Sequence, residues 1–347
     1  MGTLNSYEEV ELAEELIKMH PWSDSVRFAR TGGEACSIAI RIARAASQKD
    51  KILFCGYHGW HDWYLSTNIN SKRLDTQLLS GLKAKGVPKN LKNSAMSFEY
   101  NDLKSFKEKI SLYKNEIGTI IMEPVRSVKP KKGFLEYIQK TAKKIGAVFI
   151  IDEITSGFRE NLGGIHIKYK VKPDIAVLSK AMSNGYPCSA IIGTKEIMEN
   201  AQDTFISSCM WTERLGFAAS LATIKKFRKI SLQKKLIKYG KQIKRGWKNI
   251  SKSSGIKILI AGIDPIPQFN FEEDHIVKST FFNQEMLKRG YLVNNRLCTT
   301  HAYNEKIINK NLDNVYDVFN LISYYEKKGI DLPLQGPLRH ETFKRLV

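Results

Sequence analysis

Short apolar runs alternate with amphipathic helical patterns along the first two thirds of this chain, and this alternation constrains the fold more than any other feature. The runs that predict buried strands are Ile52 to Phe54, Thr119 to Met122, Ala147 to Ile151, Ile175 to Leu178 and Ala190 to Ile192. Helical patterns lie between several of them, for example at Phe134 to Lys144. Strands that alternate with helices predict an α/β fold with a large, mostly parallel sheet covered by helices on both faces.

The pattern changes near Lys225, where a strongly basic stretch begins. From Lys225 to Lys248 there are 11 Lys and Arg residues and no acidic residue. Apolar residues recur in this stretch, mostly four and seven apart, at Leu232, Leu236, Ile243 and Trp247. This spacing predicts one long helix with a buried stripe and a basic outer face.

A chain of 347 residues is long enough for two domains. Beyond the basic stretch, the sequence predicts short strands around Pro267 to Phe271 and helices around Thr280 to Arg289 and Leu312 to Lys327. We therefore expect a large domain over residues 1–228 and a smaller C-terminal α+β domain over residues 229–347.

The charge balance bears on possible partners. The chain has 55 Lys and Arg residues against 35 Asp and Glu, a net charge of +20, which fits either a nucleic-acid partner or a solvated basic surface. No RNA-binding, zinc-finger or helix-turn-helix motif accompanies the basic stretch. We interpret the stretch as a solvated helix and expect no nucleic-acid partner. The alternative, binding through residues 225–248, predicts salt-sensitive affinity for RNA or DNA.

Other features predict a cytoplasmic protein. No run of about 18 apolar residues predicts a membrane span, and the first 16 residues lack the basic and apolar regions of a signal peptide. The five cysteines are widely spaced and form no C-x-x-C pair: Cys36, Cys55, Cys188, Cys209 and Cys298. They are typical of reduced thiols, and predict neither a disulfide framework nor a metal site.

Three charged residues follow predicted strands. Glu123 ends IIME, Asp152 ends VFIID and Lys180 follows IAVLS. Ligands of open α/β sheets bind outside the carboxyl ends of the strands, so we expect these side chains to converge. An acid and a lysine in one crevice are the pair that a pyridine aldehyde cofactor needs.

Such a cofactor makes four physical demands. A lysine amine can form a Schiff base only where its surroundings favour the neutral amine, and a buried carboxylate must stabilise the proton on the pyridine nitrogen. The phosphate needs a Gly-rich helix N-terminus, and an aromatic ring must cover the pyridine face. The sequence offers Lys180, Asp152, the turn Thr31-Gly32-Gly33, and Tyr57.

Six motifs then occur in order across residues 26–224: RFARTGGEACSIAIRIARA, GYHGWHDW, IIMEPV, KKGFLEYI, FIIDEITSGFR and LSKAMSNGYPCSAIIG. In this order they resemble the class III pyridoxal-phosphate aminotransferases, in particular the branch that includes glutamate-1-semialdehyde aminomutase and sugar-modifying relatives. The resemblance implies a PLP-dependent transferase of fold type I. It also implies pyridoxal 5'-phosphate as cofactor and a homodimer with the active site at the interface.

The resemblance assigns roles to individual residues. Lys180 becomes the Schiff-base lysine and the acid/base that moves the proton between substrate and cofactor, and Asp152 becomes the partner of the pyridine nitrogen. Tyr57 becomes the stacking aromatic, and Glu123 an acid near cofactor and substrate. His58 lies in the same motif, where it either braces the loop or contacts the substrate.

The phosphate site departs from the family pattern at two positions. The resemblance makes Gly32 and Gly33 the phosphate-binding turn, but Gly33 stands where relatives carry a hydroxyl residue. Cys209 stands where they carry a threonine that reaches the neighbouring subunit's phosphate. Losing two neutral donors costs about 1 kcal/mol each, so we expect weaker cofactor retention. Nearby hydroxyls that can compensate are Thr31, Ser208 and Thr212.

The chain also begins almost at the predicted cofactor domain, whereas relatives have a substantial preceding segment. It is therefore expected to be a short form, a chain with a misassigned start, or a fragment. We expect an aminotransferase that acts on a small-molecule amino donor and a carbonyl acceptor. The alternatives are a glutamate-1-semialdehyde-type aminomutase, which shares every residue named above, and a catalytically impaired protein of this fold.

Overall fold

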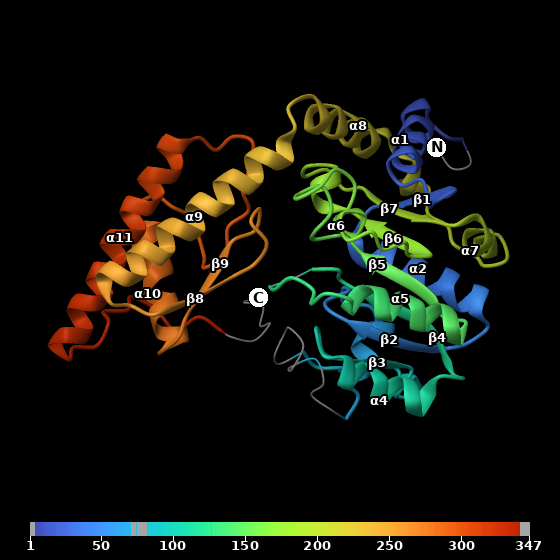
Figure 1. Ribbon diagram of the computed structural model, residues 1–347, viewed down its shortest axis with the longest axis horizontal. Coiled ribbons are helices and arrows are strands. Elements are labelled where there is room, and N and C mark those ends of the chain that lie inside the picture. The colour runs from blue at the N-terminus through green and yellow to red at the C-terminus, as the bar shows by residue number, and fades with distance from the viewer. Residues whose placement is uncertain (1–3, 71–73, 75–81, 126, 341–347) are drawn as a thin grey trace. The chain divides into compact units, whose positions relative to one another are not determined.

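The computed structural model describes residues 4–70, 74, 82–125 and 127–340 (Figure 1). The chain divides into two compact units, which we describe separately. The first comprises residues 1–126 and 130–230, and the second residues 127–129 and 231–347.

The first unit is built on a sheet of seven strands in the order β1-β7-β6-β5-β4-β2-β3. The strands are β1 (Ser25–Ala29), β2 (Lys51–Cys55), β3 (Ala95–Ser97), β4 (Ile117–Met122), β5 (Val148–Asp152), β6 (Ile175–Leu178) and β7 (Ser189–Gly193). Strand β7 runs antiparallel to both β1 and β6, and the remaining neighbours are parallel. The mostly parallel sheet is therefore confirmed.

Helices cover both faces of this sheet (Figure 1). Because side chains alternate along a strand, Ile150 of β5 packs in the cluster with helix α2, whereas Phe149 and Ile151 pack in the cluster with α4 and α5. The longer helices are α1 (Tyr7–Met19), α2 (Gly32–Ser47), α4 (Leu103–Tyr113), α5 (Phe134–Ile145) and α8 (Arg214–Lys229). The short ones are α3 (Asp62–Leu65), α6 (Ile165–Lys168), α7 (Lys195–Met198), η1 (Ser66–Asn68), η2 (Lys89–Leu91), η3 (Lys180–Met182), η4 (Glu199–Ala201) and η5 (Cys209–Thr212). This arrangement confirms the predicted α/β class.

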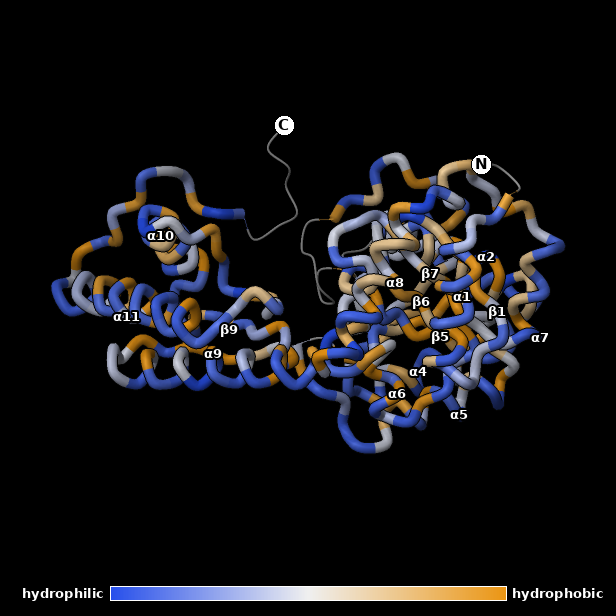
Figure 2. Tube along the Cα trace, turned by 90° about the horizontal axis from the view of Figure 1, so that it is seen from above, coloured by the Kyte–Doolittle hydropathy of each residue, from blue (hydrophilic) through white to orange (hydrophobic). Residues whose placement is uncertain are grey.

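The second unit packs three helices and a two-stranded antiparallel sheet around one core. Its elements are α9 (Leu232–Ser254), β8 (Ile258–Ala261), β9 (Gln268–Phe271), α10 (His275–Lys288) and α11 (Glu305–Lys328). Trp247 and Phe319 both pack against Phe269, with ring centroids 4.9 and 5.8 Å away. Figure 2 shows α9 as a mixture of blue and orange, as expected of a helix with one buried stripe.

The prediction of one helix over residues 225–248 is wrong, because α8 ends at Lys229 and α9 begins at Leu232. Between them, Ser231 adopts a left-handed backbone with φ of +47°. The physical reason lies in the phase of the apolar residues. Phe227 of α8 and Leu236 of α9 are both buried, and in one continuous helix nine residues would place them on opposite sides. The buried stripe itself is confirmed at Leu236, Ile243 and Trp247.

Among the helices in the described part of the chain, none combines the length and the apolar character needed to cross a bilayer.

Candidate functional site

A cavity of about 550 Å³ lies in the first unit where strands β5 and β6 end. Its walls come from the start of α2, the loop after β2, the loop after β5 and the residues after β6. Seven of the residues that the sequence singled out line it: Thr31, Gly32, Gly33, Tyr57, His58, Asp152 and Lys180. The predicted convergence of the acid and the lysine is therefore present in the structure.

Asp152, the last residue of β5, is only 2% exposed. Its Oδ1 accepts a hydrogen bond from the Ile154 N–H at 2.9 Å, and its Oδ2 lies 2.8 Å from Nδ1 of the buried His58. The Cys36 thiol donates to Oδ2 at 3.5 Å. Burial, and then the nearby Asp152 charge, raise the pKa of Cys36 well above its ordinary value, so this thiol keeps its proton. These three groups fix the carboxylate at the cavity wall.

Lys180 follows β6 by two residues and has a left-handed backbone with φ of +44°. Such a conformation costs a non-glycine residue on the order of 1–3 kcal/mol, and persists only where the surroundings impose it. The Lys180 Nζ donates a hydrogen bond to the Thr155 hydroxyl at 2.9 Å. The strained backbone therefore directs the amine to the loop that follows Asp152.

The turn at Gly32 and Gly33 opens helix α2. Thr31 caps the helix: its hydroxyl accepts from the Glu34 N–H at 3.3 Å and donates to the Glu34 carboxylate at 3.2 Å. The cap thus engages the Thr31 hydroxyl and the N–H of Glu34. The N–H groups of Gly32 and Gly33 come earlier in the helix and are not part of this cap. A Cβ at Gly32 would lie 2.8 Å from Cδ1 of Ile154, so a larger residue there would have to push the Ile154 side chain aside.

Glu123 lies behind the cavity and is not one of its lining residues. It is 4% exposed, and its Oε2 accepts a hydrogen bond from the Tyr57 N–H at 3.0 Å. A Cβ at Gly56, whose φ is +116°, would lie 2.7 Å from the same oxygen. This contact positions the loop that carries Tyr57. The predicted role of Glu123 as a catalytic acid near cofactor and substrate stays a prediction.

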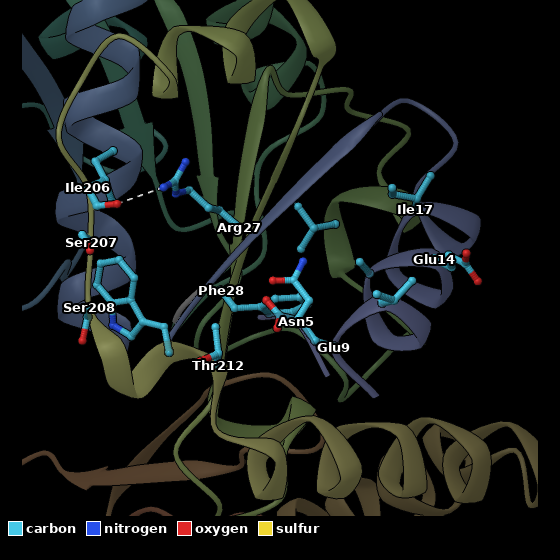
Figure 3. A pocket seen from close by; sticks show the side chains of 14 residues that line it. Asn5, Glu9, Glu14, Ile17, Arg27, Phe28, Ile206, Ser207, Ser208 and Thr212 are labelled. Atoms are coloured by element: carbon cyan, nitrogen blue, oxygen red, sulfur yellow. Dashed lines mark hydrogen bonds between the residues drawn. The ribbon is translucent and has the colours of Figure 1, made fainter. Parts of the chain in front are cut away.

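Three predicted cofactor residues do not line the cavity around Lys180. Ser208 and Thr212 line a second cavity of about 490 Å³ between α1, β1 and η5, and Cys209 is exposed beside them. Figure 3 shows Ser208 and Thr212 on the same side of this second cavity, across from helix α1. Within one chain, these residues are therefore not brought together with Lys180.

A buried cluster next to the site was missed by the sequence reasoning. Glu153 follows Asp152 and accepts hydrogen bonds from both the backbone N–H and Nδ1 of His166, each at 2.7 Å. The Trp22 indole, which can only donate, lies 3.3 Å from His166 Nε2, so His166 is neutral with its proton on Nδ1. Burial acts to raise the pKa of Glu153, but the hydrogen bonds from His166 hold this pKa below its ordinary value. The cluster anchors the loop that carries Thr155.

His20 completes this cluster and gives a prediction about stability. Its ring stacks on that of His166, with centroids 5.5 Å apart, and burial lowers the pKa of His20 from 6.5 to about 4. The hydrogen bond between His20 Nδ1 and the Leu16 carbonyl, and then the Glu153 charge, act to raise this pKa but do not outweigh the burial. Below pH 6.5 the unfolded chain therefore binds a proton that the folded chain does not bind until about pH 4. The free energy of unfolding should fall over this window, by on the order of 3 kcal/mol.

The measurement is urea unfolding of the wild type and of His20→Gln at pH 7.5, 6, 5 and 4. The His20→Gln variant should show a smaller fall between pH 6.5 and 4, and replacement of the exposed His301 by Gln should leave the fall unchanged. If the free energy of unfolding falls equally in the wild type and in His20→Gln, the lowered pKa of His20 is not the cause.

One contact in this cluster joins residues that are distant in the chain. Trp22 and His166 are 144 positions apart, and no spacing rule joins them. Thr155 and His61, which also line the cavity around Lys180, lay within quoted motifs. Thr155 follows Asp152 by three positions and His61 follows His58 by three, and this closeness in sequence was the signal that could have identified them.

Comparisons with known proteins agree with this geometry. A family model described as "Aminotransferase class-III" matches residues 1–295. The chain is 33% identical over 281 residues to a glutamate-1-semialdehyde 2,1-aminomutase of Methanosphaera stadtmanae, covering 78% of this chain and 64% of that protein. It is 30% identical over 270 residues to a 3-aminobutyryl-CoA aminotransferase of Cloacimonas acidaminovorans, covering 76% and 61%. The matched part is thus less than two thirds of the length of either relative.

Solved structures give the same fold. The FumI protein of Sphingopyxis sp. MTA144, solved in its PLP internal aldimine form, has a TM-score of 0.83 at 22% identity, covering 94% of this chain and 77% of that one. An omega-transaminase from Sphaerobacter thermophilus has a TM-score of 0.82 at 20% identity, covering 91% and 78%. These likenesses confirm the predicted transferase fold.

Proposed function

We propose, because the chain belongs to the class-III aminotransferase family, that it binds pyridoxal 5'-phosphate in the cavity around Lys180. We further propose that it moves an amino group between an amino donor and a carbonyl acceptor. The observation that carries the proposal is that Lys180 and the buried Asp152 line one cavity of about 550 Å³. This volume lies within the range of about 300–1,000 Å³ that is usual for cofactor and ligand sites.

The residues present fit the cofactor. The first N–H groups of α2, at Gly32 and Gly33, form the kind of helix N-terminus that binds phosphate. The Asp152 carboxylate suits a protonated pyridine nitrogen, and Tyr57, which lines the same cavity, offers an aromatic ring to cover the pyridine face. When bound, pyridoxal phosphate supplies an electron sink for the negative charge that develops at the donor carbon.

The chain's own residues would divide the remaining work. Lys180 Nζ is the group positioned to hold the cofactor and to move the proton at the donor carbon. Asp152 is kept in place by Ile154, His58 and Cys36, so the charge opposite the pyridine nitrogen does not have to reorganise during the reaction. Thr155 holds the Lys180 amine beside Asp152's loop until the cofactor enters.

A panel of amino donors tests the proposal. The purified protein, titrated with pyridoxal phosphate, should develop visible absorbance, and at least one amine or amino acid should then bleach it while a carbonyl product is released. If the absorbance forms but no donor from a broad panel changes it, amino transfer is contradicted and the catalytically impaired alternative is favoured.

The second candidate is an aminomutase, which the 33% identity to a glutamate-1-semialdehyde 2,1-aminomutase favours. In such a reaction one molecule gives and receives the amino group, so no separate carbonyl product accumulates. Steady release of a keto acid from a separate donor would exclude a pure mutase. Conversion of a single amino aldehyde without such release would favour it.

We also propose a homodimer in which η5 of each chain reaches the cavity of the other. The support is that Ser208, Cys209 and Thr212 do not line the cavity of their own chain. Light scattering should give a mass near twice the 39.6 kDa of one chain. A 39.6 kDa particle that binds no cofactor would contradict the dimer and point to an inactive relative.

We also propose a cytoplasmic location and a division into two domains. None of the five cysteines is paired in a disulfide, which supports a reducing compartment and hence the cytoplasm. The cavity lies entirely within the first unit, which supports residues 1–228 as the cofactor domain and residues 229–347 as the smaller domain. Limited proteolysis near residues 229–231 would test this boundary.

A further inference from the structure

His61 lines the cavity around Lys180, and no role was predicted for it. Its Nδ1 is buried and has no hydrogen-bond partner among the residues that the structure describes. The Trp60 ring stacks on the imidazole, with centroids 4.5 Å apart and planes 19° apart, so the ring plane is fixed. A buried polar atom without a partner is costly. This arrangement is therefore better suited to the protein with a ligand bound than to the protein without one.

The imidazole occupies the space beside Gly33. A Cβ at Gly33 would lie 2.9 Å from Cε1 and 3.1 Å from Nδ1 of His61. Any side chain at this position would therefore begin where the ring now lies. Gly33 is the second residue of the 16-residue helix α2, so the unpartnered nitrogen lies next to the first turn of that helix.

We propose that His61 Nδ1 donates a hydrogen bond to the phosphate of the bound cofactor, and so replaces the hydroxyl that is absent at Gly33. This inference rests on the proposed function, because it assumes that pyridoxal phosphate occupies the cavity. The Gly32 and Gly33 N–H groups and the imidazole N–H would then all donate to the phosphate. Hydrogen bonds to a charged phosphate are about twice as strong as neutral ones.

The electrostatics around His61 agree with this role. Burial lowers the pKa of His61, while Glu34 and Asp62 act to raise it. The free protein therefore holds a mostly neutral imidazole, which donates from Nδ1 in one of its two tautomers. A phosphate dianion beside Nδ1 favours the form that carries a proton there.

The test compares the affinities of the apoprotein for pyridoxal phosphate and for pyridoxal, which lacks the phosphate. His61→Ala should bind pyridoxal phosphate about 10- to 100-fold more weakly, the loss expected for one hydrogen bond to a charged group. Its affinity for pyridoxal should stay within about twofold of the wild type, since that ligand makes no phosphate contact. Replacement of the exposed His301 by Ala serves as the matched control, with unchanged affinity for both ligands.

A double variant sharpens the test. Gly33→Ser combined with His61→Ala places a hydroxyl in the space that the ring has left, and should recover most of the lost affinity for pyridoxal phosphate. Gly33→Ser alone should force the His61 ring to move, because a Cβ at Gly33 lies 2.9 Å from its Cε1. Its affinity for pyridoxal phosphate should not exceed that of the wild type. Unfolding curves for each variant show whether the fold is intact.

Three results would overturn the inference. An unchanged affinity of His61→Ala for pyridoxal phosphate would do so, as would an equal loss for pyridoxal, which indicates packing alone. If Trp60→Phe loses affinity for pyridoxal phosphate and His61→Ala does not, the phosphate contact belongs to the Trp60 indole N–H instead. Its Nε1 lies 3.8 Å from the position of a Cβ at Gly33. Failure of the wild type to bind pyridoxal phosphate at all contradicts the proposed function itself, and so is distinguishable from these outcomes.

Discussion

Replacing Lys180 with alanine should remove amino transfer almost completely. The expected loss in rate is at least about 100-fold and up to about 10,000-fold, the range over which a positioned acid or base accelerates a proton transfer. The reason is geometric: Nζ of Lys180 lines the cavity and is held at 2.9 Å by Thr155, beside the loop of Asp152. The measurement is the rate of carbonyl product release under saturating pyridoxal phosphate.

Two comparisons make this prediction specific. The exposed Lys195, which pairs with Glu199 at 3.6 Å, offers a matched control, and Lys195→Ala should keep full activity. Added methylamine should restore part of the activity of Lys180→Ala, because a small amine can enter the space and carry the proton. A Lys180→Ala variant that retains more than about a tenth of the wild-type rate would contradict the assignment.

Replacing Asp152 with asparagine should lower the rate by about 10- to 100-fold while leaving the fold intact. The amide keeps the shape of the carboxylate but carries no charge to stabilise a proton on the pyridine nitrogen, and a hydrogen bond to a charged group is worth about 1.5–3 kcal/mol. The amide also accepts the His58 and Cys36 hydrogen bonds less well. The measurement is the rate of amino transfer, together with the shift in the visible absorbance of the loaded protein.

Asp174 provides the control for this prediction. It lies just before β6, and its Oδ2 accepts the Phe149 N–H at 2.8 Å, so it holds the same pair of strands at the other end of the sheet. Asp174→Asn should lower stability and leave the rate per folded molecule unchanged. Equal rates in Asp152→Asn and the wild type would show that this carboxylate does not act on the cofactor.

The parts of the fold that depend on local periodicity were predictable from the sequence. Buried strands such as β4 and β5 read as continuous apolar runs because helices cover both faces of the sheet. Their carboxyl ends meet at one edge, so Asp152 and Lys180 could be expected in one crevice before any coordinates were known.

What the sequence did not reveal depends on contacts between distant segments. The break at Ser231 follows from a change of phase between two apolar stripes, and this change becomes visible only when Phe227 and Leu236 are assigned to different units. The pairing of Glu153 with His166 likewise requires the loop between them to fold back. The unpartnered nitrogen of His61 beside Gly33 needs three-dimensional distances.

The most direct test of the central claim is reduction of the protein with borohydride after loading with pyridoxal phosphate, followed by mass mapping of its peptides. The account predicts that one reduced pyridoxyl phosphate group per chain becomes fixed on the Lys180 side chain, and that the Lys180→Ala variant carries none at this position. Label spread over many exposed lysines, with no preference for position 180, would contradict the account.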